Sequence, residues 1–187
     1  MGLSSLWGAA EEGVRTDRET ELDDLMRRHR VPPETFFASA NTESMWLFLD
    51  SLRCYAAAID SAALICAHAA CERELAAALS AQTPPAGSER WGLGPLIQVG
   101  AKRGWFDDGL KEQLKRINEN RRVFYHHQGE PLHTVLWQGA VAAASIPHKD
   151  AVMAAFPQQL RAAALDALDG ILNVRAISLG DQPPTVT

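Results

Sequence analysis

Two arginines and two histidines lie within one short stretch of the chain, Arg121, Arg122, His126 and His127. Arginine carries a permanent planar cation that suits phosphate oxygens, whereas histidine has an unperturbed pKa near neutrality and can accept or release a proton. Cleaving a phosphodiester without a metal uses both groups, because a hydroxyl proton leaves while negative charge develops on the phosphate. The cluster therefore indicates phosphodiester chemistry or phosphate binding.

A charged helix end is the plainer interpretation of the same cluster. Helix C-termini attract Lys, Arg and His, because the helix dipole and the free carbonyls favour cations there. Residues 102–127 carry a net charge of +3, although the whole chain carries −5. An anionic ligand is expected to prefer this region, but a solvated helix face with i,i+4 ion pairs also explains its charges.

The element that must position the cluster is a helix over residues 107–128. Asp107 and Asp108 place negative charge at its start, and the segment 128–131, which contains Gly129 and Pro131, ends it. Leu110, Leu114, Ile117 and Phe124 recur at helical spacing and are expected to point inward. The arginines and histidines then lie at the C-terminal end of this helix.

The rest of the chain predicts an all-α fold, because it is rich in alanine and leucine and has 47% hydrophobic and 22% charged residues. We expect helices over 17–30, 42–80, 93–103, 132–143 and 148–177, the second of them long and alanine-rich and the last kinked or restarted at Pro157. The predicted organisation is an N-terminal extension with a short charged helix (1–40), a helical domain (41–178) and a flexible tail (179–187).

This layout, with the segment 92–97, the Gly104-Trp105-Phe106 turn and a helix closing in Arg-x4-His, resembles the HEPN superfamily. Many members of that superfamily are metal-independent endoribonucleases or the toxins of toxin–antitoxin pairs. The resemblance covers residues 42–175 and implies a bundle of four to six helices around a long central one. It also implies that Arg121 and His126 are the catalytic pair, that RNA is the substrate, and that two protomers build one cleft as a homodimer.

One residue departs from the family pattern. Arg122 stands where members usually carry a small polar residue, and a shifted register pairs Arg122 with His127 at the same spacing. Residues five apart on a helix point about 140° apart, so Arg121 and His126 converge only if the helix loosens or a second protomer supplies one group. A non-catalytic module that binds a nucleotide or a protein partner, such as an antitoxin, remains the alternative.

Further residues are predicted to contact the substrate. Asn118 lies one helical turn before Arg122 and can orient it by a hydrogen bond, and Arg116 adds a cation. Glu72, four residues after His68, stands where some family members keep an acidic residue that faces the motif, although a surface ion pair with a neighbouring arginine also explains it. The predicted substrate-binding residues are therefore Arg122, His127, Asn118, Glu72 and Arg116.

Neither a cofactor nor a metal is expected. His126, His127 and His133 have no acidic or thiol ligand at a familiar spacing, and the adjacent arginines repel cations. Charged residues such as Asp50 and Arg53 interrupt the most apolar segment, so no run of about 18 uncharged apolar residues predicts a membrane span. The first residues lack the pattern of a signal peptide, and the sequence thus predicts a cytoplasmic protein with no membrane partner.

Overall fold

The computed structural model describes residues 9–30, 39, 41–82, 84–125, 135–144 and 149–178. Within these ranges the fold is all-α, as predicted, with seven α-helices, one short 3-10 helix and no strand. The number of α-helices exceeds the predicted four to six. The helices are α1 (Ala9–Arg28), α2 (Thr42–Ala56), α3 (Asp60–Ser80), η3 (Ser88–Arg90), α4 (Leu93–Lys102), α5 (Asp108–Tyr125), α6 (Val135–Ala143) and α7 (Lys149–Ser178).

The predicted single helix over 42–80 is wrong, because the chain reverses after α2. The Ile59 amide donates to the Cys54 carbonyl at 2.8 Å and the Ala58 amide donates to the Tyr55 carbonyl at 3.0 Å. Together with the left-handed backbone of Ala58, at a φ of 58°, these bonds form a Schellman motif, which ends a helix. α2 and α3 consequently pack side by side as a hairpin.

The predicted helices over 93–103 and 107–128 correspond to α4 and α5. A second Schellman motif ends α4, with Gly104 at a φ of 68° and the Trp105 amide donating to the Gly100 carbonyl at 3.0 Å. Asp107 then caps the start of α5, where its Oδ1 accepts the Leu110 amide at 2.8 Å. α4 and α5 therefore form a second hairpin, which packs on α3.

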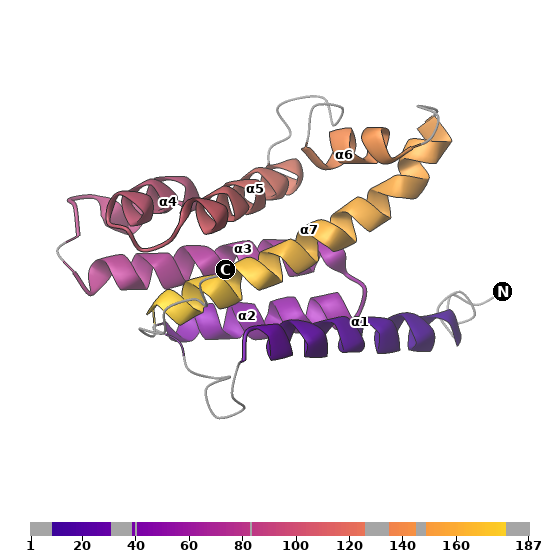
Figure 1. The fold of residues 1–187 in the computed structure, drawn as a ribbon, viewed down its shortest axis with the longest axis horizontal. Coiled ribbons are helices and arrows are strands. Elements are labelled where there is room, and N and C mark those ends of the chain that lie inside the picture. Colours follow the sequence, from indigo (N-terminus) through magenta and orange to yellow (C-terminus); the bar gives the residue numbers. More distant parts are fainter. Residues whose placement is uncertain are drawn as a thin grey trace.

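α3 contacts α2, α4, α5 and α7 (Figure 1). α7 crosses it as one continuous helix that contains Pro157, so the chain does not restart there. Small side chains let helices approach closely, and both α3 and α7 bury several alanines. The buried alanines are Ala63, Ala67 and Ala70 of α3 and Ala163, Ala164 and Ala167 of α7.

The inner face of α5 packs tightly against α7. Leu114 and Ile117 are fully buried, as their spacing predicts. A Cβ placed on Gly170 of α7 would lie 2.5 Å from Ile117 Cδ1, so a side chain at that position would have to displace Ile117. This packing fixes the rotation of α5 and with it the direction of the residues beside Ile117.

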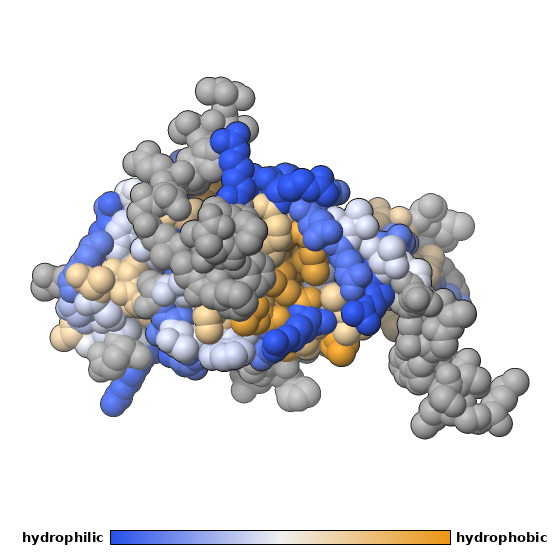
Figure 2. Space-filling view, turned by 90° about the horizontal axis from the view of Figure 1, so that it is seen from below, coloured by the Kyte–Doolittle hydropathy of each residue, from blue (hydrophilic) through white to orange (hydrophobic). Residues whose placement is uncertain are grey.

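α1 lies along α2 on the side of the molecule away from α4 and α5 (Figure 1). The view from that side shows an apolar area bordered by hydrophilic side chains (Figure 2). Leu25 of α1 is fully buried, and Arg18 is buried as well. Among the described helices, none combines the length and the apolar character that crossing a bilayer requires.

Candidate functional site

Arg121 lies near the end of α5 and contacts α3. Its Nη1 is 3.4 Å from Nε2 of His68, and the same Nε2 is 3.3 Å from Oδ1 of Asn118. Asn118 and Arg121 are three residues apart and therefore share one face of α5. We call His68, Asn118 and Arg121 the polar cluster. It unites two residues that the sequence nominated with a histidine that sequence reasoning had placed only beside Glu72.

Burial keeps the His68 imidazole neutral. The residue is 3% exposed. Burial and the neighbouring Arg121 guanidinium lower the pKa of His68 to about 4, and the hydrogen bond to Asn118 Oδ1 opposes the shift. At neutral pH the cluster therefore holds one charge, that of Arg121, beside an uncharged imidazole and an uncharged amide.

Glu72 lies on α3, one turn beyond His68, and its side chain faces the start of α4. Its Oε2 accepts the Leu93 amide at 3.0 Å, and a Cβ on Gly92 would lie 3.5 Å from the same oxygen. A carboxylate at a helix N-terminus satisfies a free amide and interacts favourably with the helix dipole. Glu72 thus joins α3 to α4. This structural role was not predicted from the sequence, which nominated Glu72 only as a substrate-binding residue.

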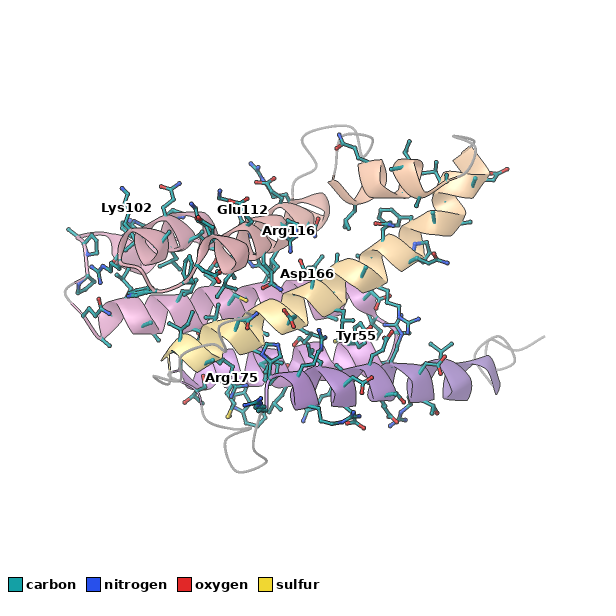
Figure 3. The ribbon with its side chains drawn as sticks, in the orientation of Figure 1. Tyr55, Lys102, Glu112, Arg116, Asp166 and Arg175 are labelled. Carbon is teal, nitrogen blue, oxygen red and sulfur yellow. The ribbon has the colours of Figure 1, made fainter. Side chains whose placement is uncertain are left out.

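The other two predicted arginines bind carboxylates outside the polar cluster. Arg122 pairs with Glu119 on the exposed side of α5, with Nη1 and Oε2 3.1 Å apart. Arg116 pairs with Asp166 of α7, with Nη2 and Oδ1 3.1 Å apart (Figure 3). Arg121 and Arg122 therefore point in different directions, and the structure brings Arg121 alone into contact with His68.

His126 and His127 lie outside the described residues, as does His133. The predicted roles of His126 and His127 therefore remain predictions. The choice between the two motif registers also remains open. The described part of α5 ends at Tyr125.

Sequence reasoning missed an ionic network that fastens α1 to the bundle. Arg18 donates to both carboxylate oxygens of Asp60 at the start of α3. Tyr55 and Arg161 both donate to Oε2 of Glu21. Burial and the Glu21 carboxylate raise the pKa of Tyr55 to about 12, so its hydroxyl keeps its proton.

A further polar contact joins the end of α1 to α7. Nε2 of His29 lies 2.9 Å from Oδ1 of Asp169, whose other oxygen accepts from Gln113 at 2.9 Å. Burial raises the pKa of Asp169, but hydrogen bonds from His29 and Gln113 outweigh it and the pKa falls below its usual value. The heavily charged pattern of α1 is a signal for such contacts but does not identify the partners.

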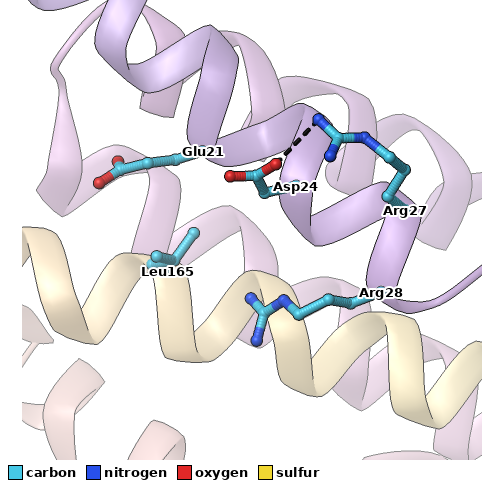
Figure 4. A pocket seen from close by; sticks show the side chains of 5 residues that line it. All are labelled: Glu21, Asp24, Arg27, Arg28 and Leu165. Carbon is cyan, nitrogen blue, oxygen red and sulfur yellow. Dashed lines mark ion pairs between the residues drawn. The ribbon is translucent and has the colours of Figure 1, made fainter.

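An open cavity of about 540 Å³ lies between α1 and α7. Its lining mixes both signs of charge, and Asp24 pairs with Arg27 inside it (Figure 4). The residues of the polar cluster do not line it, and its charges partly neutralise one another. Its lining residues are Glu21, Asp24, Arg27, Arg28 and Leu165.

The described residues contain no group of three or more His, Cys, Asp or Glu side chains arranged to hold a metal ion. Comparison of the chain with protein-family models, curated proteins and solved structures finds no match. The resemblance to the HEPN superfamily therefore rests on the sequence motif and its place in the helical layout.

Proposed function

We propose that this protein is a metal-independent endoribonuclease of the HEPN type, in which Arg121 binds the scissile phosphate and His126 transfers protons. The observation that carries the proposal is the position of Arg121. Its guanidinium is half-buried near the end of α5 and lies 3.4 Å from the neutral imidazole of His68. The cation at this position is therefore suited to an anionic ligand.

Partial burial strengthens such an interaction. Charges attract more strongly where water is partly excluded, and a guanidinium can donate two parallel hydrogen bonds to one phosphate. Arg116 and Arg122 are exposed, and they pair with Asp166 and Glu119. We therefore assign phosphate recognition to Arg121 and a supporting electrostatic role to the two neighbouring arginines.

The proposed reaction is an internal transesterification. His126 accepts the proton of a ribose 2′-hydroxyl, and the 2′-oxygen attacks the adjacent phosphorus. The bond from phosphorus to the 5′-oxygen breaks, the 5′-oxygen takes a proton, and the products carry a 2′,3′-cyclic phosphate and a 5′-hydroxyl. Arg121 stabilises the negative charge that develops on the phosphate oxygens. In the homodimer implied by the family resemblance, one protomer supplies Arg121 and its partner supplies the histidine.

Cleavage of RNA in EDTA tests this proposal. Wild type is expected to produce 2′,3′-cyclic phosphate ends, and Arg121→Ala and His126→Ala are each expected to cleave at least about 100-fold more slowly. Arg122→Ala is the matched control, because its side chain is exposed and paired with Glu119. Its rate should fall by less than about tenfold. A correctly folded wild type that leaves RNA intact, or equal rates in all four proteins, contradicts the enzymatic proposal.

A non-catalytic binding module is the second candidate. Arg122 occupies the position of the family's small polar residue and forms an ordinary surface ion pair with Glu119. Such a module would bind a nucleotide or a protein partner, for example an antitoxin, through the same helix end. Inactive wild type that still binds RNA, with binding lost in Arg121→Ala, supports this candidate.

A further inference from the structure

The His68 ring nitrogen faces two groups with opposite requirements. Arg121 Nη1 always donates a hydrogen bond, and Asn118 Oδ1 always accepts one. Both lie at hydrogen-bond distance from Nε2, at 3.4 and 3.3 Å. A neutral imidazole carries at Nε2 either a proton or a lone pair, so it can satisfy only one of these neighbours at a time.

The Asn118 amide lies between His68 and α4. A Cβ placed on Gly94, in the first turn of α4, would lie 3.7 Å from Asn118 Nδ2. The amide nitrogen therefore points toward α4, and Oδ1 points toward His68.

Protonating the whole ring does not resolve the conflict. An imidazolium could donate to Asn118, but it would lie beside the Arg121 guanidinium as a like charge in a site where His68 is 3% exposed. The two accessible states are thus the two neutral tautomers. One bonds to Arg121 and the other to Asn118.

We propose that His68 is a positioning residue that holds or releases Arg121 by changing tautomer. In the unliganded protein Nδ1 carries the proton, and Nε2 accepts from Arg121, which is the stronger bond because its donor is charged. When a phosphate ester binds Arg121, Nε2 carries the proton and donates to Asn118. The proton lost from Nδ1 and the proton gained at Nε2 exchange with water, so the ring stays neutral.

This inference rests on the proposed function, because it takes a phosphate ester as the ligand of Arg121. It adds a penalty that binding must overcome, because the hydrogen bond from Arg121 to His68 is lost in the liganded state. It also gives Asn118 a defined role as the acceptor that stabilises the liganded tautomer. Asn118 and His68 would then act on RNA binding without contacting the RNA.

Nitrogen NMR of the histidine side chains tests the tautomers directly. The probe is a 2′-O-methyl RNA oligonucleotide, which lacks the attacking hydroxyl and is not cleaved. In free wild type, Nε2 of His68 should give the signal of an unprotonated nitrogen, and saturating oligonucleotide should move it to the protonated range. His68→Gln identifies the resonance.

Two variants separate this inference from the proposed function. Arg121→Met removes the donor, so Nε2 should be protonated even without RNA. Asn118→Leu removes the acceptor, so Nε2 should stay unprotonated when RNA binds and affinity should fall about fivefold. Failure of wild type to bind RNA refutes the proposed function, whereas the response of free Arg121→Met still tests the tautomer.

Two results overturn the inference itself. One is a His68 Nε2 that is already protonated in free wild type. The other is an unprotonated Nε2 that is unchanged in folded Arg121→Met and in RNA-bound wild type.

Discussion

Replacing Arg18 with alanine is expected to destabilise the protein by about 3 to 5 kcal/mol, because it leaves the Asp60 carboxylate buried without its cation. Arg18 is 5% exposed and Asp60 is 9% exposed. The guanidinium also donates to the Tyr55 carbonyl at 3.2 Å and lies over the Tyr55 ring at 4.7 Å from its centroid. Urea unfolding of wild type and Arg18→Ala measures the loss.

A matched control exists on the same helix. Arg15 pairs with Glu19, but both side chains are more than half exposed, so Arg15→Ala should change the free energy of unfolding by less than about 0.5 kcal/mol. Replacing both buried partners, as in Arg18→Met with Asp60→Leu, should restore much of the loss, since no unpaired charge remains. Equal stabilities for Arg18→Ala and Arg15→Ala would show that the buried pair does not fasten α1.

Acidification is expected to destabilise the protein by about 3 kcal/mol through His68 alone. The folded pKa of His68 is about 4, against 6.5 in the unfolded chain. Between these values the unfolded state binds the proton that the folded state rejects, so the free energy of unfolding falls as pH drops from 6.5 to 4. Above pH 6.5 this contribution is constant.

His68→Gln isolates this effect from other acid-sensitive groups. Asp169 has a lowered pKa in the folded state, so its stabilising contribution is also lost as pH falls. Urea unfolding of wild type and His68→Gln at several pH values between 4 and 7 removes that shared part. The difference between the two proteins should change by about 3 kcal/mol over the range. Parallel curves would mean that His68 is protonated as easily in the folded state as in the unfolded one.

Two helix ends with the same hydrogen-bond pattern show what the sequence could predict of the fold. Gly104 is the residue type that adopts a left-handed backbone most easily, and the end of α4 was predicted from it. Ala58 adopts a similar backbone at the end of α2 without that signature. The apolar pattern continues across the break, so the sequence predicted one long helix where the chain forms a hairpin of two helices.

The candidate site divides in the same way. Helical spacing predicted that Asn118 and Arg121 lie near one another, because three residues make almost one turn. The contact of Arg121 with His68 joins residues 53 positions apart and depends on how α5 is rotated against α3 and α7. No local pattern encodes that rotation.

The attachment of α1 was unpredictable for a different reason. Its sequence alternates acidic and basic residues, which is typical of a solvated helix. Arg18 is buried because Asp60, which the break at Ala58 places at the start of α3, lies opposite it. The turn at Ala58, which was not predicted, therefore places Asp60 where it can pair with Arg18.

The affinity of a 2′-O-methyl RNA oligonucleotide for wild type, Arg121→Ala and Arg122→Ala, at one fixed salt concentration, tests phosphate recognition by Arg121 most directly. Loss of a charge-assisted hydrogen bond should weaken binding by Arg121→Ala at least about tenfold. Removal of the neighbouring exposed charge in Arg122→Ala should weaken it less than about threefold. Equal affinities in the two variants, or undiminished binding by Arg121→Ala, would contradict a phosphate site at Arg121.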